Sequence, residues 1–135
     1  MSWLSRLFRP RELDNPAGSS GYSRLEVRAE ASTWAARSPS RSWVEVAATG
    51  SMVPTIDSGS ILLLEKVTGT DLRVGDIAIY QSADGKSTIC HRVRDVSKSG
   101  AVLFTGDNNR GTSPDGWIDS RRILWRVAGI LYTKR

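Results

Sequence analysis

The sequence predicts a single domain of the mainly β class, built from antiparallel strands. Three observations point to this class. The 135 residues suffice for one ordinary domain and are too few for two domains with separate cores. Six short segments after residue 42 are apolar or alternate between apolar and polar residues, which is typical of strands. Turn-forming residues separate these segments at short intervals, as in a mainly antiparallel domain.

The six predicted strands have two kinds of pattern. The first and fourth alternate between apolar and polar side chains, whereas the second and third are mostly apolar. Turns such as Asp57-Ser58-Gly59 and Lys98-Ser99-Gly100 separate neighbouring strands. The predicted strands lie at residues 43–48, 61–67, 77–81, 87–96, 101–105 and 123–132.

Residues 1–42 are predicted to form a basic tail rich in Ser and Arg, and residues 43–135 to form the domain. Most of residues 16–42 is interpreted as linker, with a short strand or helix at 22–31. Residues 2–9 carry apolar side chains at i, i+4 spacing, which predicts a short amphipathic helix. This helix is a candidate for peripheral membrane contact; the alternatives are a helix docked on the domain and a frayed terminus.

Cysteine content, hydropathy and charge narrow the class of protein. The one cysteine, Cys90, excludes an internal disulfide. The longest apolar runs, such as residues 61–64, are far shorter than the roughly twenty residues of a spanning helix. No export signal is visible, so a cytoplasmic or peripheral membrane location is expected. The net charge of the chain is +5. The basic tail is most simply a solvated segment, so a nucleic-acid partner is not expected.

Ser51 has the setting of a serine nucleophile. It follows Gly50, which permits a sharp turn, and precedes Pro54, which stiffens the exit from that turn. Thr49 is placed to offer its hydroxyl to a developing oxyanion, beside the backbone N–H of Ser51. The alternative interpretation is a serine in an ordinary turn.

His91 is the one histidine and lies on a predicted strand. Because side chains alternate along a strand, His91 shares a face with Ile89 and Val93, while Cys90 points to the opposite face. A neutral imidazole on an apolar face is able to accept a proton. The alternative interpretation is a core histidine without a catalytic role.

Several motifs in order carry a resemblance to a known family. These motifs are Ser51-Met52-Val53-Pro54-Thr55-Ile56, Gly75-Asp76-Ile77, His91-Arg92-Val93 and Gly106-Asp107-Asn108-Asn109. Over roughly residues 43–132 the sequence resembles the signal peptidase I family, in which most bacterial members have Lys in place of His91. The histidine makes the chain similar to the branch found in the endoplasmic reticulum, in archaea and in some bacteria.

The resemblance implies a serine endopeptidase that cleaves a peptide or protein substrate after small residues. It also implies the small β catalytic core that this family shares with LexA-like SOS repressors. By the resemblance, Ser51 is the nucleophile, His91 is the general base, and Met52 and Pro54 contact the substrate. The Ser51 N–H and Thr49 are expected to stabilise the oxyanion.

The acid that orients the histidine is less directly indicated by the resemblance. The family carries an Asp several residues after the Gly-Asp-Asn motif, and Asp115 is nearest to that position. Asp107 is then expected to shape the loop, and Asp119 ranks third. No cofactor or metal is expected, since His91 and Cys90 face opposite ways and cannot together supply a zinc shell. Carboxylates alone leave magnesium or calcium as a formal alternative.

Two other functions are kept as alternatives. The first is self-cleavage of the SOS-repressor type at the Ala17-Gly18 bond, in the tail before Ser51. The second is a non-catalytic peptidase-fold module that binds a membrane surface through its basic tail. The presence of Ser, His and Asp together favours the enzyme over the module.

Overall fold

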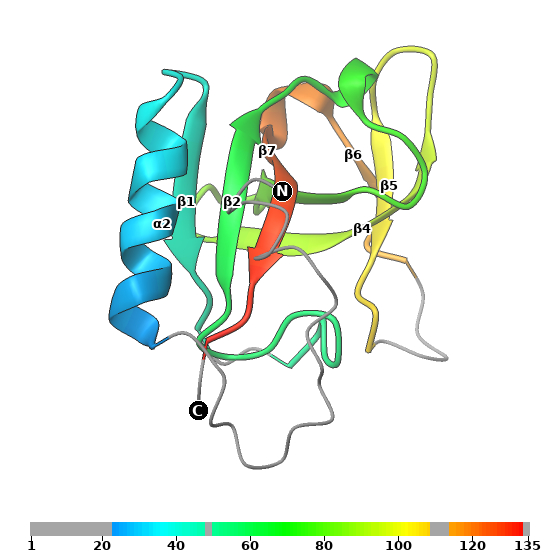
Figure 1. The fold of residues 1–135 in the computed structure, drawn as a ribbon. Coiled ribbons are helices and arrows are strands. Elements are labelled where there is room, and N and C mark those ends of the chain that lie inside the picture. Colours follow the sequence, from blue (N-terminus) through cyan, green and yellow to red (C-terminus); the bar gives the residue numbers. More distant parts are fainter. Residues whose placement is uncertain (1–22, 48–49, 109–113, 134–135) are drawn as a thin grey trace.

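A computed structural model describes residues 23–47, 50–108 and 114–133 (Figure 1). Within these residues the protein is mainly antiparallel β, which confirms the predicted class. One α-helix and two short 3-10 helices accompany seven strands in the described part of the chain. The helices are α2 (Arg24–Ala36), η1 (Gly69–Asp71) and η2 (Ser120–Arg122); the strands are β1 (Arg41–Glu45), β2 (Ile61–Lys66), β3 (Ile77–Gln81), β4 (Thr88–Val96), β5 (Val102–Thr105), β6 (Trp117–Ile118) and β7 (Ile123–Leu131).

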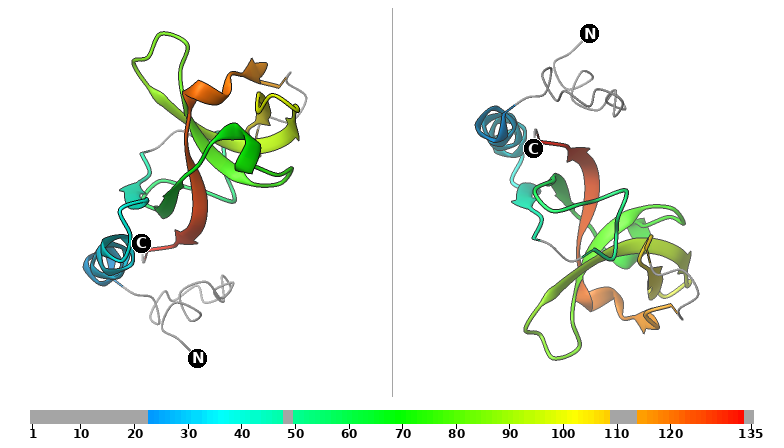
Figure 2. Two further views of the ribbon diagram at one scale, coloured as in Figure 1. Left: turned by 90° about the horizontal axis from the view of Figure 1, so that it is seen from above. Right: turned by 90° about the horizontal axis from the view of Figure 1, so that it is seen from below.

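The seven strands form one sheet in the order β1-β2-β7-β3-β4-β5-β6, and every neighbouring pair is antiparallel. The last strand, β7, lies between β2 and β3 and joins the two halves of the sheet. Viewed from above and below, α2 with β1 and β2 lies at one end of the molecule, and β4 with β5 lies at the other (Figure 2). Register shifts occur where β7 pairs with β2 and with β3, and such irregularities increase the bending of a sheet.

Helix α2 begins at a capping box. The Ser23 hydroxyl accepts a hydrogen bond from the Glu26 N–H at 3.2 Å, and the Glu26 carboxylate accepts one from the Ser23 N–H at 2.6 Å. Val27, Ala31 and Trp34 recur at i, i+4 and i+7 and are buried in one cluster with side chains of β2 and β7. The short strand or helix expected at residues 22–31 is thus the first part of α2, whereas the interpretation of residues 32–36 as linker is wrong.

Helix α2 and the start of β1 precede Trp43, where the domain was predicted to begin. Strand β1 pairs with β2 along its whole length. On β1, Glu45 forms ion pairs with Arg24 and Arg28 of α2, which tie the helix to the edge of the sheet. The amphipathic segment predicted at residues 2–9 lies outside the described residues.

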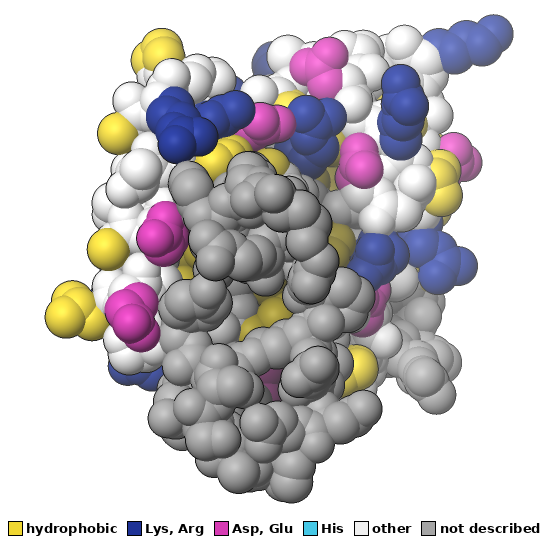
Figure 3. Space-filling view, in the orientation of Figure 1, with side chains coloured by type: hydrophobic (Ala, Val, Ile, Leu, Met, Phe, Trp, Pro, Cys, Tyr) yellow, Lys and Arg dark blue, Asp and Glu magenta, His cyan; other side chains and the backbone are white. Residues whose placement is uncertain are grey.

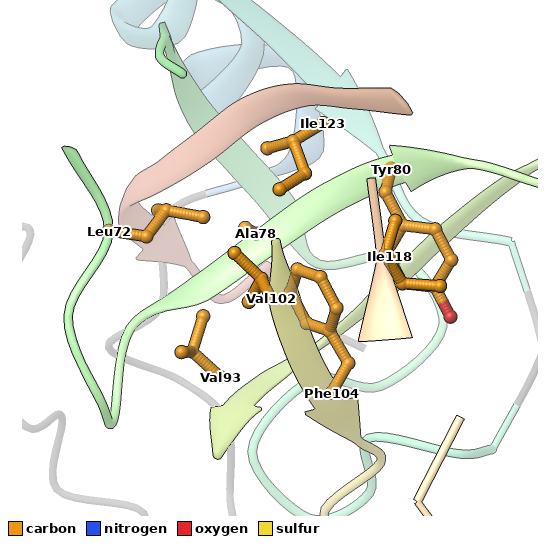
Figure 4. Close-up of a cluster of buried hydrophobic side chains, with 8 residues drawn as sticks. All are labelled: Leu72, Ala78, Tyr80, Val93, Val102, Phe104, Ile118 and Ile123. Atoms are coloured by element: carbon orange, nitrogen blue, oxygen red, sulfur yellow. The ribbon is translucent and has the colours of Figure 1, made fainter. Parts of the chain in front are cut away.

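Alternation along the strands divides the apolar side chains among three buried clusters. In β2, Ile61 and Leu63 pack with α2, whereas Leu62 and Leu64 pack with Ile79 of β3. Both faces of β2 are thus covered, which explains its unbroken apolar run. The third cluster is built on β3, β4 and β5 and is shown in Figure 4: Leu72, Ala78, Tyr80, Val93, Val102, Phe104, Ile118 and Ile123.

The faces of β4 agree with the sequence pattern. Val93 is buried in the cluster of Figure 4, and Ile89 packs against that cluster. Cys90 packs instead against the cluster that contains Ile79. His91 lies between these residues on the Val93 side and pairs in register with Ala78 of β3. The predicted alternation at positions 89–93 is confirmed.

The surface in Figure 3 carries both signs of charge. Lys and Arg side chains are spread over this face with Asp and Glu side chains among them. Several charges of the described residues are paired: Glu65, for example, forms ion pairs with Arg41 and Arg126. In residues 23–47, 50–108 and 114–133, no helix has the length and hydrophobicity required to cross a membrane.

Candidate active site

Ser51 lies in the connection between β1 and β2. Gly50 before it has φ +77, a left-handed conformation that glycine adopts without strain. The turn is closed by hydrogen bonds from Val53 N–H to Gly50 O at 3.3 Å and from Ile56 N–H to Met52 O at 2.8 Å. The buried side chain of Met52 anchors the segment in the core, so the backbone around Ser51 is fixed.

His91 reaches Ser51 from β4. Its Nε2 atom lies 3.1 Å from Ser51 Oγ, within hydrogen-bond distance. The imidazole is 8% exposed, so little water competes for its nitrogens. The structure therefore does not support the alternative of a core histidine that faces away from Ser51.

Asp115 contacts the imidazole nitrogen that does not face Ser51. Its Oδ2 atom contacts His91 Nδ1, and its backbone N–H donates to the Phe104 carbonyl of β5 at 2.9 Å. Asp115 directly precedes Gly116, whose φ of +87 turns the chain into β6. The structure thus brings together three of the predicted site residues: Ser51, His91 and Asp115.

Asp107 occupies a different place. Its carboxylate accepts two hydrogen bonds from the Arg92 guanidinium, each at 2.7 Å, and one from the Thr55 hydroxyl at 2.6 Å. Within the described residues it forms no hydrogen bond with His91. The hydrogen bond from Arg92 is the main reason that the pKa of Asp107 is below its ordinary value. This position agrees with the expectation that Asp107 shapes the loop.

Asn108 extends this contact to the serine turn. Its backbone N–H donates to the Ser51 carbonyl at 2.8 Å, and its side-chain amide donates to the Gly50 carbonyl at 3.0 Å. The Gly-Asp-Asn motif therefore braces the turn that carries Ser51, although the two segments lie more than fifty residues apart in sequence. Arg92 also donates to the Gly75 carbonyl at 2.8 Å, which connects the Gly75-Asp76-Ile77 motif to the same network.

Replacing Asp107 by asparagine is expected to lower the free energy of unfolding by about 1–2 kcal/mol at neutral pH, since Arg92 loses its charged partner. A carboxylate with a depressed folded-state pKa stabilises the protein above its unfolded-state pKa of about 4. That contribution is lost as the pH falls through the folded-state value. Thermal unfolding should therefore show that the difference between the wild type and Asp107→Asn closes in acid.

Asp119→Asn is the matched control for this measurement. Asp119 is exposed, pairs with Arg121 and caps the 3-10 helix η2, a capping role that asparagine retains. Its substitution should change stability by no more than about 0.5 kcal/mol. A stability loss in Asp107→Asn that stays constant down to about pH 2 would contradict the role assigned to the carboxylate charge.

Comparison with known proteins finds similar sequences among the signal peptidases. The chain is 30% identical over 102 residues to the signal peptidase complex catalytic subunit SEC11C of Homo sapiens. The aligned region covers 68% of this chain and 53% of the relative. It is 34% identical over 64 residues to signal peptidase I W of Bacillus subtilis (strain 168). This aligned region covers 44% of this chain and 33% of the relative. The chain is similar to signal peptidases over these regions. The resemblance read from the motif order is thereby confirmed.

Other comparisons set the limits of this relationship. The human putative signal peptidase complex catalytic subunit SEC11B is 30% identical over 92 residues, 61% of this chain and 55% of the relative. The chain spans about half the length of the SEC11 relatives that it matches. No family model matches the chain, and no solved structure matches it.

A groove of about 380 Å³ adjoins Ser51. Its walls come from the end of β1, the serine turn and the start of β4, and most of its side chains are apolar. Met52, predicted to contact substrate, lines the groove, whereas Pro54 is exposed and does not. The lining residues are Val44, Glu45, Val46, Ala47, Ser51, Met52, Ile56, Ile79, Thr88, Ile89 and Cys90.

Cys90 also lines this groove, next to His91 in sequence. Burial is the main reason that the pKa of its thiol is raised, to about 12, and the negative charge of Asp107 adds to the effect. The thiol is therefore protonated at neutral pH and is a poor nucleophile. Ser51 is the hydroxyl that both contacts the imidazole and faces the groove.

Three remaining predictions concern other positions. Thr49 and the Ala17-Gly18 bond lie outside the described residues. Asp119, the third candidate acid, pairs with Arg121 at 3.1 Å and makes no contact with His91. In the part of the chain that the structure describes, no group of three or more His, Cys, Asp or Glu residues is arranged to hold a metal ion.

The sequence reasoning missed one residue at the site, Tyr80 of β3. Its hydroxyl donates a hydrogen bond to Asp115 Oδ2 at 2.6 Å. The apolar pattern of residues 77–81 indicated only a buried strand. A usable signal was present, because a buried tyrosine hydroxyl requires a hydrogen-bond partner, but the sequence does not say which one.

Proposed function

We propose that the chain is a serine endopeptidase of the signal peptidase type that uses Ser51, His91 and Asp115. The observation that carries the proposal is the unbroken line of contacts from Ser51 Oγ through both imidazole nitrogens to Asp115 Oδ2. A serine hydroxyl is activated when an adjacent base accepts its proton and a third group orients that base. The similarity to signal peptidases supports the same class of reaction.

The proposed reaction is acyl transfer. Ser51 Oγ attacks the carbonyl carbon of the scissile peptide bond while His91 Nε2 accepts the hydroxyl proton. The carbonyl electron pair moves to oxygen, and the tetrahedral intermediate collapses as His91 returns the proton to the leaving amine. Water, deprotonated by the same nitrogen, then hydrolyses the ester on Ser51 and regenerates the free hydroxyl.

Asp115 and the serine turn supply the remaining parts of the mechanism. Asp115 accepts a hydrogen bond from His91 Nδ1–H, which selects the tautomer whose Nε2 is unprotonated and stabilises the imidazolium. The backbone N–H of Ser51, which forms no hydrogen bond with another described residue, is proposed as one donor to the oxyanion. Thr49 is proposed as the second donor, as in the sequence analysis.

The groove favours an extended peptide as substrate. Among the described residues, positions 88–91 of β4 pair with β3 on one side only, and the groove adjoins positions 88–90. An extended peptide is able to pair with such an edge while its side chains enter apolar pockets. By the family resemblance we propose cleavage after small residues, with alanine at the scissile position.

A pair of matched peptides tests this function. Purified protein is incubated with a peptide that carries Ala-x-Ala before one bond, and with the same peptide carrying Arg in place of both alanines. Mass spectrometry should detect cleavage after the second alanine of the first peptide and little cleavage of the other. Absence of turnover with both peptides would return the chain to the alternative of a non-catalytic module.

A further inference from the structure

Tyr80 is a buried tyrosine whose polar end reaches the proposed active site. It is 2% exposed and belongs to the apolar cluster of β3, β4 and β5. Its ring stacks on Phe104 with a centroid distance of 4.6 Å and an interplanar angle of 29°. Figure 4 shows the ring among the apolar side chains, with the hydroxyl at the margin of the cluster.

The Tyr80 hydroxyl and the His91 imidazole meet the same oxygen atom. Tyr80 Oη donates to Asp115 Oδ2 at 2.6 Å, and His91 Nδ1 contacts that same Oδ2 atom. Strand register explains the arrangement, since Ala78 is opposite His91 and Tyr80 is opposite Ile89 on the same pair of strands. Tyr80 and His91 therefore project from one face, one diagonal step apart.

The hydroxyl is held in a donor role. Burial and the hydrogen bond to Asp115 raise the pKa of Tyr80 above its ordinary value, so the phenol stays protonated at neutral pH. The ring cannot move easily, because Phe104 packs against it and Asp115 is itself bonded through its N–H to the Phe104 carbonyl. Phe104 thus contacts Tyr80 and Asp115 at the same time.

We propose that Tyr80 is a positioning residue, which fixes Asp115 Oδ2 against His91 and withdraws part of the negative charge that this oxygen presents to the imidazole. The inference rests on the proposed function, because it assigns Asp115 the task of orienting His91. A donor to the carboxylate makes it a weaker partner for an imidazolium. Tyr80 therefore limits how strongly Asp115 favours the protonated histidine, while it keeps the carboxylate in place.

Other charged groups near the pair are accounted for. Arg122 of η2 lies over the Tyr80 ring, 6.0 Å from its centroid, and donates to the Gln81 carbonyl. Asp107 is close enough to His91 for the two charges to interact, but it is paired with Arg92. Neither Arg122 nor Asp107 is altered by removal of the Tyr80 hydroxyl.

Tyr80→Phe tests the proposal, because it keeps the stacked ring and removes one oxygen. His91 is the one histidine, so its ring signals in an NMR titration are unambiguous. In a Ser51→Ala background, which removes turnover, Tyr80→Phe should move the titration midpoint of His91 upward by about half a pH unit. In the otherwise wild-type protein it should lower kcat about threefold to tenfold with KM little changed.

Tyr132→Phe is the matched control. Tyr132 also donates its hydroxyl, to the Thr55 carbonyl at 2.7 Å, but it is bound neither to Asp115 nor to His91. Loss of the Tyr132 hydroxyl should leave the titration midpoint of His91 unchanged.

A second probe retains the packing of the ring. 3-Fluorotyrosine at position 80 is a more acidic phenol and a stronger hydrogen-bond donor, so it should move the midpoint of His91 downward. A midpoint that is unchanged or lower in Tyr80→Phe, or unchanged with 3-fluorotyrosine, would overturn the proposal.

The NMR titration separates this proposal from the proposed function. It reports the contact among Tyr80, Asp115 and His91 whether or not the protein cleaves peptides. If peptides are not cleaved but the midpoint moves as stated, the proposed function fails and the coupling of the three residues stands. If peptides are cleaved and the midpoint does not move, the function stands and the role of Tyr80 is refuted.

Discussion

Ser51→Ala and His91→Gln are each expected to lower kcat for peptide cleavage by about 10⁵–10⁶, because attack and proton transfer require both groups together. Ser51 Oγ and His91 Nε2 are 3.1 Å apart, so each substitution removes the same activated nucleophile. The measurement is the initial rate of cleavage of the Ala-x-Ala peptide, followed by mass spectrometry at saturating substrate.

Ser58→Ala is the control for Ser51→Ala. Ser58 is an exposed serine in the same connection between β1 and β2, and it does not line the groove. Loss of the Ser58 hydroxyl should leave the rate of peptide cleavage unchanged.

Groups that act as a unit give non-additive effects, so the double variant Ser51→Ala, His91→Gln should be no slower than either single variant. A Ser51→Ala protein that cleaves at the wild-type rate would refute the assignment.

Asp115→Asn is expected to lower kcat by about 10³–10⁴ with the fold retained, because an amide no longer selects the right tautomer of the imidazole. Asparagine fills the same space, and its backbone N–H still donates to Phe104. An amide group that donates to Nδ1 would place the imidazole proton on Nε2, which then cannot accept the proton of Ser51.

Asp119→Asn separates this effect from a general loss of acidic charge. Asp119 is four residues away, is exposed and binds Arg121. Its substitution should leave kcat unchanged, and so should not reproduce the loss seen at Asp115. If the two variants lost activity equally, or if Asp107→Asn rather than Asp115→Asn abolished turnover, the orienting acid would have to be reassigned.

Local patterns were sufficient to predict much of the sheet and to single out Ser51 and His91, whose side chains the structure brings within hydrogen-bond distance. The apolar run in β2, the alternation in β4 and the glycine turns are encoded by neighbouring residues, and the corresponding strands are observed. The opposite faces of Cys90 and His91 follow from the same alternation. Ser51 and His91 were identified from a stiff turn and a lone histidine on a strand.

Features that depend on distant contacts were harder to predict. The composition of the α2 segment left strand and helix open at residues 22–31, although Ser23 and Glu26 form a capping box and Val27, Ala31 and Trp34 have helical spacing. The two-residue strand β6 is too short to carry a period and exists because β5 provides its partner.

The contacts of the acidic residues show the same limit. The pairing of Asp107 with Arg92 and Thr55, and that of Tyr80 with Asp115, join residues 15 to 52 positions apart in sequence. Alternation placed Arg92 and His91 on opposite faces, but it could not say which carboxylate each face would meet. Only the packing of the strands and loops decides that.

The most direct test of the proposed mechanism is covalent capture of Ser51. A peptide boronic acid with the sequence Ala-x-Ala, in which boron replaces the carbonyl carbon of the final residue, accepts an electron pair from Ser51 Oγ while His91 takes the hydroxyl proton. Boron NMR should show a tetrahedral boron signal with the wild type and with Ser58→Ala, and only trigonal boron with Ser51→Ala. A tetrahedral signal of equal strength in Ser51→Ala, or trigonal boron in a wild-type protein that cleaves the matching peptide, would contradict Ser51 as the nucleophile.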